Sequence, residues 1–502
     1  MFGLSFDTAA PVERAHPARA DIALFVGWTT RRAGTPLPPP IAAWLAERRY
    51  RADDALRDVP VPIDTWAVFD ALFDWHARPV APGAAERADD YLGLAVRDFF
   101  ANGGRKAYVV RLGDPWPVEP QIDGADRAAA RRQLLPLAGA SGWMRESWRG
   151  IEHAWALDDL SFVLVPDLPD LFGDPRRPVP GDEPQAPAVP EVFVECAASQ
   201  AAPEPPSGVR RIAAPRLGDD SFAAWNDTAR ELRDRLARRR RDLMLLLALP
   251  LAAADARAAH SLRDVGRLRT GLLQSSMVQI AAPWLQPLRA SRTPAGLVPG
   301  DGALAGLIAA GVLAQGAART VAGSAPAGVL AVLPQPRDEH LRTPPPGREH
   351  EALGSQLSLF APTPNGVRLL SDVSRSAQRG WQPAGVVRLI GQLLRSAREL
   401  GETLVFEPSG EALWTRVRSR FEELLTRWWQ IGALRGATAA EAFDLQCDRG
   451  TMSQVDLDHG RVVVLLSFQP QLSIERIRVA LALAKDGRIG LEPADAVLET
   501  QP

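Results

Sequence analysis

The sequence predicts a mixed α/β protein, and two apolar patterns carry this prediction. Short apolar runs recur at residues 21–27, 160–165, 243–249 and 462–466, and runs of this length are typical of strands buried on both faces of a sheet. Elsewhere apolar residues recur every three or four positions, as in amphipathic helices, most regularly over residues 411–431. A chain of 502 residues has room for two or three domains of about 100–200 residues each.

The first predicted elements are a strand and two short helices. The strand at 21–27 ends in a glycine, and the loop after it closes with three consecutive prolines, which cannot continue a hydrogen-bonded ladder. Residues 41–47 form a short helix candidate. A second helix runs through Phe69 and Leu72, and Asp64 is placed as its N-cap.

A helix, a glycine turn and a strand follow one another over residues 91–111. The helix is predicted to stop at Asn102, Gly103 and Gly104, because asparagine and glycine tolerate the positive φ angles of a tight helix end. The strand covers residues 107–111. A phosphate-binding loop has the opposite order, with the strand first and a lysine and a hydroxyl in register. We therefore interpret the glycines as a turn rather than a nucleotide site.

Residues 112–240 are predicted to be mostly surface loops around the buried strand at 160–165. Proline, aspartate and glycine are dense at 169–190, which is typical of an exposed loop, and 192–195 is a further strand candidate. The next helix ends in four arginines at 238–241. Such a cluster can bind nucleic acid, but cations also suit a helix C-terminus, and no aromatic residues interleave with them. We expect no nucleic-acid partner.

A small-residue helix and a strand precede the predicted domain boundary. The helix at 303–317 is rich in alanine and glycine, the strand spans 328–333, and residues 334–352 are rich in proline and charge. A strand at 357–360 opens the last domain, and an amphipathic helix follows at 386–400. The arginines outside the apolar stripe of this helix are expected to face solvent or a partner: Arg388, Arg395 and Arg398.

The last domain centres on a long amphipathic helix at 411–431. Residues 403–407 before it form an apolar strand candidate, and Ser409 is placed to cap the helix. Gly432 follows the apolar stripe, where a left-handed residue ends a helix at low cost.

Three strands are predicted after this helix. Residues 442–447 alternate between apolar and polar, as in a strand with one buried face. Residues 462–466 are wholly apolar, as in a central strand. Residues 475–484 alternate again, either completing the sheet of their own domain or pairing with the sheet edge of a neighbouring subunit.

Composition excludes several classes of protein. The net charge of −2 gives no general electrostatic attraction to nucleic acid or to an anionic membrane. The two cysteines, Cys196 and Cys447, fit a reduced cytosol better than a disulfide scaffold. The start of the sequence lacks the pattern of a secretory signal, and no apolar run approaches the roughly 20 residues of a membrane span.

No motif for catalysis, cofactor binding or metal binding stands out. The seven histidines include no pair at the spacing of a helical metal site, and no Gly-x-Ser-x-Gly elbow occurs. Asp448, Asp456 and Asp458 do not match a calcium loop and are interpreted as turn residues, like His459. A protease triad assembles from distant residues, so spacing alone does not exclude one. We expect a protein that is not an enzyme and has no cofactor or metal.

Several motifs in the last domain resemble one family. They comprise Phe406, Glu407, Pro408, Leu413, Trp414, Arg416, Val417, Gly432, Ala433, Leu434, Gly436, Glu441, Ala442, Phe443, Cys447, Asp448, Asp456, Asp458, His459, Gly460, Ile474 and Glu475. In this order they resemble the C-terminal domain of contractile tail sheath proteins, and the helix with Phe100, Asn102, Gly103 and Gly104 resembles a second block of that family. Sheath proteins form the outer tube of contractile phage tails, R-type bacteriocins and extracellular contractile injection systems.

The resemblance implies an architecture. An N-terminal arm would cover residues 1–20, a core domain with subtilisin-like topology residues 21–345, a C-terminal α/β domain residues 346–485, and a tail residues 486–502. The region 112–240 would be outer decoration of the core.

The resemblance also implies a function. Subunits would assemble in the cytoplasm as a homo-oligomer of stacked rings around an inner tube protein, together with baseplate and cap proteins, and would contract to drive the tube through a target envelope. One alternative is a sheath paralogue that does not contract, such as a cap or baseplate-proximal component. Another is an enzyme on a sheath-like fold. The opening at residues 19–27 resembles injection-system sheath proteins more than those of phages.

Two groups of residues are candidate interaction sites on this reading. The charged face of the 411–431 helix is the candidate contact to the inner tube: Glu411, Arg416, Arg418, Arg420, Glu422 and Glu423. The strand near the end of the chain is the candidate for pairing between subunits: Arg476, Ile477, Arg478, Val479 and Leu481. The segments 1–20 and 486–502 are stronger candidates for exchange between subunits.

Overall fold

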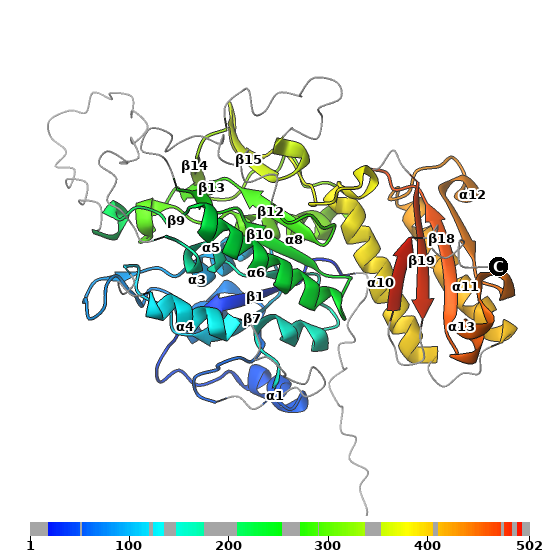
Figure 1. The fold of residues 1–502 in the computed structure, drawn as a ribbon, viewed down its shortest axis with the longest axis horizontal. Coiled ribbons are helices and arrows are strands. Elements are labelled where there is room, and N and C mark those ends of the chain that lie inside the picture. The colour runs from blue at the N-terminus through cyan, green and yellow to red at the C-terminus, as the bar shows by residue number, and fades with distance from the viewer. Residues whose placement is uncertain are drawn as a thin grey trace, which may run out of the picture.

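Two sheets organise the protein, with one long helix between them (Figure 1). The computed structural model describes residues 19–50, 53–119, 124–134, 147–174, 208–253, 272–289, 291–336, 353–404, 410–472, 476–483 and 489–493. Helix α10 (Ala384–Leu404) lies between the larger sheet and the sheet near the end of the chain.

The larger sheet has eight strands. In chain order they are β1 (Ala23–Trp28), β3 (Val61–Ile63), β7 (Ala107–Gly113), β8 (Phe162–Leu164), β10 (Met244–Ala248), β12 (Val278–Ala282), β15 (Ser358–Thr363) and β16 (Gly366–Leu369). Their order across the sheet is β16, β15, β12, β10, β8, β1, β7, β3. Neighbouring strands from β7 through β15 are parallel, and the two edge strands β3 and β16 run antiparallel to their neighbours.

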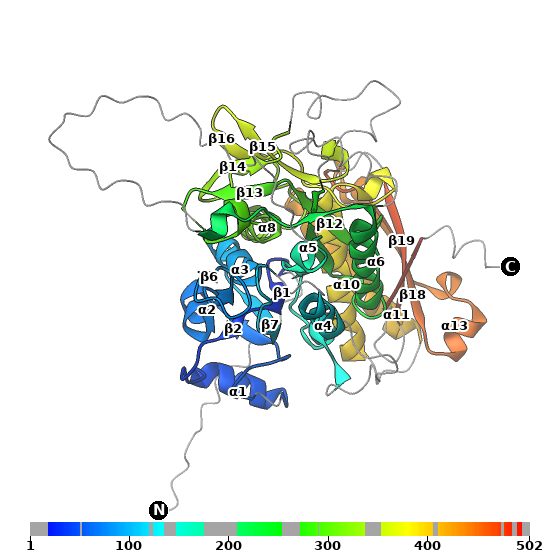
Figure 2. The same ribbon diagram turned by 60° about the vertical axis from the view of Figure 1, so that its left-hand side comes forward.

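The centre of this sheet is buried on both faces, as the apolar runs predicted. Successive side chains of β1 point to opposite sides, so Ala23 and Phe25 join one hydrophobic cluster while Leu24 and Val26 join another. Helices α3 (Tyr91–Ala101) and α8 (Asp301–Gln315) cover the first side, and α6 (Asp219–Ala237) covers the second. Figure 2, turned by 60°, shows these helices and the central strands from another direction.

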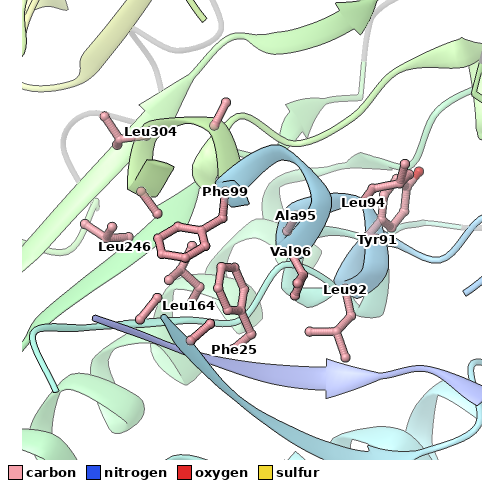
Figure 3. Packing of buried hydrophobic residues seen from close by; sticks show 14 of the residues in the cluster. Phe25, Tyr91, Leu92, Leu94, Ala95, Val96, Phe99, Leu164, Leu246 and Leu304 are labelled. Carbon is pink, nitrogen blue, oxygen red and sulfur yellow. The ribbon is translucent and has the colours of Figure 1, made fainter. Parts of the chain in front are cut away.

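Aromatic contacts join α3 to the sheet. The rings of Phe25 and Phe99 lie edge to face, with 5.5 Å between their centroids (Figure 3). This geometry places the positive ring edge against the negative face, and it contributes about 0.5–1.5 kcal/mol beyond the buried area. Leu164 and Leu246 complete the packing from two further strands.

Glycines let α8 lie directly on α3. A Cβ added to Gly302 would come within 2.5 Å of the backbone of Ala95, and one added to Gly306 would come 2.5 Å from the carbonyl oxygen of Phe99. Any larger residue would therefore push the two helices apart. This confirms the predicted close-packing helix, which begins two residues earlier than the sequence pattern indicated.

The turn after α3 is also confirmed. Gly103 has φ +100°, in the left-handed region that glycine adopts at little cost. The side chain of Asn102 donates to the carbonyl of Asp98 over 2.8 Å and accepts from the amide of Ala327 over 2.7 Å. Strand β7 begins three residues after the turn.

The second sheet has four antiparallel strands. They are β17 (Phe443–Gln446), β18 (Val462–Phe468), β19 (Ile477–Leu483) and β20 (Ile489–Pro493), adjacent in that order. Helix α11 (Glu411–Gln430) and α10 share one hydrophobic cluster with this sheet. Gly432 has φ +71° just beyond α11, which confirms the predicted helix end.

Shorter elements complete the fold. The helices are α1 (Pro39–Glu47), α2 (Trp66–Leu72), α4 (Ala125–Leu134), α5 (Leu168–Leu171), α12 (Ala439–Ala442) and α13 (Gln454–Asp458). The strands are β2 (Thr30–Arg31), β4 (Phe73–Asp74), β5 (Arg78–Pro79), β6 (Arg87–Ala88), β9 (Arg216–Leu217), β11 (Leu251–Ala252), β13 (Trp284–Pro287) and β14 (Val329–Leu333). Among the described residues, none of the helices is both long and apolar enough to cross a membrane.

Two local predictions are wrong. Thr403 and Leu404 belong to α10 and not to a strand, because a short apolar run cannot be told from a helix segment by periodicity and a helix already formed extends at little cost. The N-cap of α2 is Thr65, whose hydroxyl accepts from the amide of Val68, and not Asp64. The side chain one residue nearer to the helix reaches the amide of the first turn.

Two predicted domain limits also need correction. The hairpin of β15 and β16 is part of the eight-stranded sheet, so the core extends past residue 345 as far as Leu369. The region 112–240 is not all decoration, because β8 lies between β1 and β10 at the centre of the sheet. Several predictions fall outside the described residues: the strand at 192–195, the cap Ser409, the loop at 175–190, and most of the two terminal segments.

Candidate functional site

Helix α11 presents the predicted charged face to the outside. One side of the helix buries Leu413, Val417, Phe421 and Leu425 in the C-terminal cluster. The other side carries the six predicted charges, which we call the α11 charged face: Glu411, Arg416, Arg418, Arg420, Glu422 and Glu423. All are exposed except Glu422, which is half-buried.

Several of these charges pair along the helix. Arg418 Nε lies 2.8 Å from Glu422 Oε1, and a nitrogen of Arg420 lies 3.6 Å from Glu423. Glu423 also meets Arg427 at 3.1 Å. Exposed pairs of this kind contribute about 0–1 kcal/mol each. A partner with complementary charges could therefore exchange them at little cost, and the contact to an inner tube stays a prediction.

Strand β19 is paired on both sides within its own chain. Its register runs from Val462 opposite Leu483 to Phe468 opposite Ile477 on one side, and from Ile489 opposite Leu483 to Pro493 opposite Val479 on the other. Over Val479–Leu483 a neighbouring subunit could pair with β19 only by replacing a strand of the same chain, whereas β20 pairs with neither Ile477 nor Arg478. The predicted pairing between subunits through residues 476–481 stays a prediction.

Sequence reasoning missed the contact between α10 and the core. Arg388, Arg395 and Arg398 were expected to face solvent or a partner, but all three side chains form buried ion pairs. Arg395 and Arg398 pair with Asp242 of the core, and Arg388 pairs with Asp372, three residues after β16. The opposite side of α10 supplies apolar residues to the C-terminal cluster. The helix thus joins the two domains with apolar side chains on one face and ion pairs on the other.

Asp242 is the centre of the larger group of ion pairs. Its carboxylate accepts from Arg240 at 2.9–3.3 Å and from Arg398 at 2.9 Å, and Arg395 lies 3.8 Å away. Its side chain is fully buried. Burial alone would raise the pKa of Asp242, but Arg240, Arg398 and Arg395 hold that pKa below its usual value.

The same group of charges acts on Arg395. Burial lowers the pKa of its guanidinium to about 10, and the nearby charges of Arg240 and Arg398 act in the same direction. Arg395 also donates to the backbone carbonyls of Asp242 and Arg19, at 3.2 and 3.0 Å. Arg240 is one of the four arginines at 238–241, and its burial in this group shows that at least one of them has a structural role.

A second ion pair lies nearer to the start of α10. Arg388 makes two parallel hydrogen bonds to Asp372, at 2.7 and 3.1 Å, with both side chains buried. Gln279 of β12 and the amide of Val321 donate to the same carboxylate. These donors outweigh burial and lower the pKa of Asp372. Geometry of this type is the strongest form of arginine–carboxylate contact.

Buried carboxyl groups also gather where β1 and β8 end. Asp90 caps α3 by accepting from the amide of Gly93, and Asp167 accepts from the amide of Trp28. Burial raises the pKa of Asp167 and Asp301 to about 7, and burial together with Asp167 raises that of Asp90. In the part of the chain that the structure describes, no three His, Cys, Asp or Glu side chains are placed to hold a metal ion. The groups act on the backbone, as caps and turn contacts.

Comparison with known proteins gives matches at the level of structure. No family model and no curated protein matches the chain. A chain in the cryo-EM structure of the anti-feeding prophage (AFP) baseplate in contracted state is 17% identical, with TM-score 0.58, over 94% of this chain and 95% of that one.

Two contracted sheath structures match over a similar length. The AFP helical sheath gives 18% identity and TM-score 0.51, over 94% of this chain and 98% of that one. The sheath complex of PVC, an extracellular contractile injection system, gives 14% identity and TM-score 0.52, over 95% and 96%. Each of these matches covers at least 94% of the chain. The chain therefore has the fold of the contractile sheath structures.

Proposed function

We propose that this chain is a structural subunit of a contractile sheath that polymerises around an inner tube. The observation that carries the proposal is the match of about 94% of the chain, in one continuous architecture, to sheath structures in the contracted state. The role is mechanical rather than enzymatic.

In this proposal the subunits stack as rings, are held in an extended arrangement, and shorten together to drive the tube through a target envelope. The sequence has no nucleotide-binding motif, so the work would come from two packings of the same interfaces that differ in free energy. The α11 charged face is the proposed contact to the tube, and cap and baseplate proteins are proposed at the two ends. The AFP and PVC matches favour an injection system over a phage tail, with assembly in the cytoplasm before release.

One observation favours a second candidate. The match with TM-score 0.58 is to a chain in a baseplate structure, which fits a sheath paralogue that sits near the baseplate and does not contract. Such a protein would form a ring but no long polymer.

The decisive experiment is ultracentrifugation and electron microscopy of the purified chain, alone and co-expressed with an inner tube protein of a contractile injection system. A contractile sheath subunit gives pelletable tubes of indefinite length, and the co-expressed sample contains tubes of two diameters. Single rings with the tube protein would favour the baseplate-proximal paralogue. A monomer that neither pellets nor binds the tube protein would refute both.

A further inference from the structure

The chain enters the core domain next to helix α10. Arg19 is the first residue that the structure describes, and β1 begins four residues later. The backbone carbonyl of Arg19 accepts a hydrogen bond of 3.0 Å from the guanidinium of Arg395 on α10. The same guanidinium donates to the backbone carbonyl of Asp242 over 3.2 Å. One side chain of α10 therefore holds both the residues before β1 and the residues before β10.

The side chain of Arg19 is fixed by Asp21. Its guanidinium makes two hydrogen bonds to the Asp21 carboxylate, at 2.7 and 3.0 Å. The Asp21 side chain is 1% exposed and that of Arg19 is 36% exposed. Paired hydrogen bonds of this kind set the orientation of both groups, which restricts the backbone at Arg19. Burial lowers the pKa of Arg395, and the negative charges of Asp242 and Asp21 oppose this effect.

These contacts lie where three central strands of the larger sheet begin. Ser161, before β8, donates its amide to the carbonyl of Ile22, and its own carbonyl accepts from the first residue of β10. Asp21 and Asp242 each precede their strand, β1 or β10, by two residues. Helix α10 lies between the two sheets (Figure 1). A contact of α10 at this point therefore joins the start of the chain to the joint between the core domain and the C-terminal domain.

We propose that Arg395 couples the start of the chain to this joint. While Arg19 keeps its place, its carbonyl holds the guanidinium of Arg395 against the core, and α10 stays docked. When a force on residues 1–18 draws Arg19 away, Arg395 loses this acceptor and α10 is bound less tightly. Coupling of this kind is reciprocal, so that release of Arg395 also loosens the start of the chain. The proposal does not depend on the proposed function.

Amide hydrogen exchange of the full-length protein, read on peptic peptides that cover residues 391–400 of α10, tests the coupling. The chain-start variant is Arg19→Gly/Asp21→Asn. It removes the ion pair, leaves no buried charge unpaired and gives the backbone at residue 19 more freedom. We expect the amides of 391–400 to exchange at least about fivefold faster in this variant than in the unmodified protein, because hydrogen bonds to charged groups are among the stronger ones.

The matched control is Arg292→Gly/Asp89→Asn. This pair has a similar exposure, 45% for the arginine and 4% for the aspartate. It lies next to the α3 cap Asp90, at the other end of β1. The control should change exchange in 391–400 by less than about twofold, because substitutions at distant sites act independently.

A cycle of combined variants tests whether the coupling runs through Arg395. In an Arg395→Met background the chain-start variant should no longer change exchange in 391–400, because the bridging guanidinium is already absent. In an Arg398→Met background its effect should persist, because Arg398 binds Asp242 and the carbonyl of Arg239 and its loss leaves the bridge in place. If Arg395→Met does not fold, Arg395→Lys takes its place, since lysine keeps the charge but lacks the planar fork that reaches two acceptors.

Three results would overturn the proposal. The first is unchanged exchange of 391–400 in the chain-start variant. The second is an effect of that variant that is as large in the Arg395→Met or Arg395→Lys background as in the unmodified protein, which would show that the coupling does not run through Arg395. The third is an equal acceleration in the control Arg292→Gly/Asp89→Asn, which would show a general loss of stability and no specific coupling.

Discussion

Replacing Asp242 with asparagine should destabilise the protein more than any exposed charge substitution. The side chain of Asp242 is fully buried, and it is the shared anion for Arg240, Arg395 and Arg398. Asparagine keeps the shape and one oxygen acceptor but removes the charge. Two buried guanidinium groups, those of Arg240 and Arg395, then lose their counter-charge in a site with little water.

The expected loss follows from the cost of an unpaired buried charge. Removing one partner of a buried ion pair typically costs about 3–5 kcal/mol, and here one carboxylate serves three cations. We therefore expect Asp242→Asn to lower the free energy of unfolding by about 3–5 kcal/mol at pH 7. Urea denaturation followed by tryptophan fluorescence measures this loss, since the chain has 14 tryptophans.

The loss should also depend on pH. The folded-state pKa of Asp242 is lowered, so its contribution is fully present above the unfolded pKa of about 3.9 and disappears as the pH falls through the folded pKa. The difference in the free energy of unfolding between Asp242→Asn and the unmodified protein should be constant from pH 7 to about pH 5 and shrink below about pH 4. Other groups titrate in both proteins and cancel in this difference.

The control is Glu423→Gln on α11, which removes a carboxylate that is 57% exposed and paired with two arginines. It should cost less than about 1 kcal/mol. Two results would show that the ion pairs do not hold α10 to the core. The first is that Asp242→Asn is no more destabilising than this control. The second is that its loss in the free energy of unfolding is as large at pH 3 as at pH 7.

Four further predictions follow from other parts of the molecule. Reversing the three arginines of the α11 charged face to glutamate should leave a folded subunit that retains less inner tube on co-purification; equal retention would contradict the proposed contact. Deleting residues 1–19 should leave a folded monomer that forms no tubes under electron microscopy, and normal tubes would show that the segment is dispensable. Gly302→Ala should lower the free energy of unfolding by about 1–3 kcal/mol, because its methyl group overlaps the backbone of Ala95; an unchanged urea midpoint would argue against close packing of α3 and α8. Asp167→Asn should flatten the fall in stability between about pH 4 and pH 7, because the raised pKa of Asp167 makes its burial progressively unfavourable as the pH rises; identical pH profiles would contradict this.

The sequence predicted those parts of the fold that depend on local patterns. Strands β1, β8, β10 and β18 lie at the apolar runs, because a strand covered on both faces must be apolar along its whole length. The glycine turn at Gly103 and the helix end at Gly432 also depend on a local pattern. Both residues have positive φ angles, a conformation that few residues other than glycine adopt at low cost.

Domain limits were harder to predict, because they depend on pairing between distant strands. The hairpin of β15 and β16 looks like the start of a new domain after a proline-rich stretch, yet β15 pairs with β12, about 80 residues earlier. Strand β8 was recognised as buried, but its place at the centre of the sheet could not be read from the loops that surround it. Local composition indicates where a strand ends and a loop begins, but it does not indicate with which strand the next strand pairs.

Helices α10 and α11 show most clearly what the sequence pattern leaves open. Both have an apolar stripe that enters the same cluster, and both carry arginines on the remaining surface. On α11 these arginines are exposed and pair with glutamates one turn away, whereas Arg398 of α10 binds Asp242, 156 residues earlier in the chain. The amphipathic pattern identifies the face that is buried against the helix's own domain, but it says nothing about a second surface that covers the charged face. Counter-charges at helical spacing do not distinguish the two helices, because Glu399 and Glu402 follow Arg395 and Arg398 of α10 by four residues, as Glu422 follows Arg418 on α11. Arg395 and Arg398 nevertheless bind Asp242, which comes from a distant part of the chain. The burial of this charged face therefore follows from the tertiary structure and not from the pattern of charges along the helix.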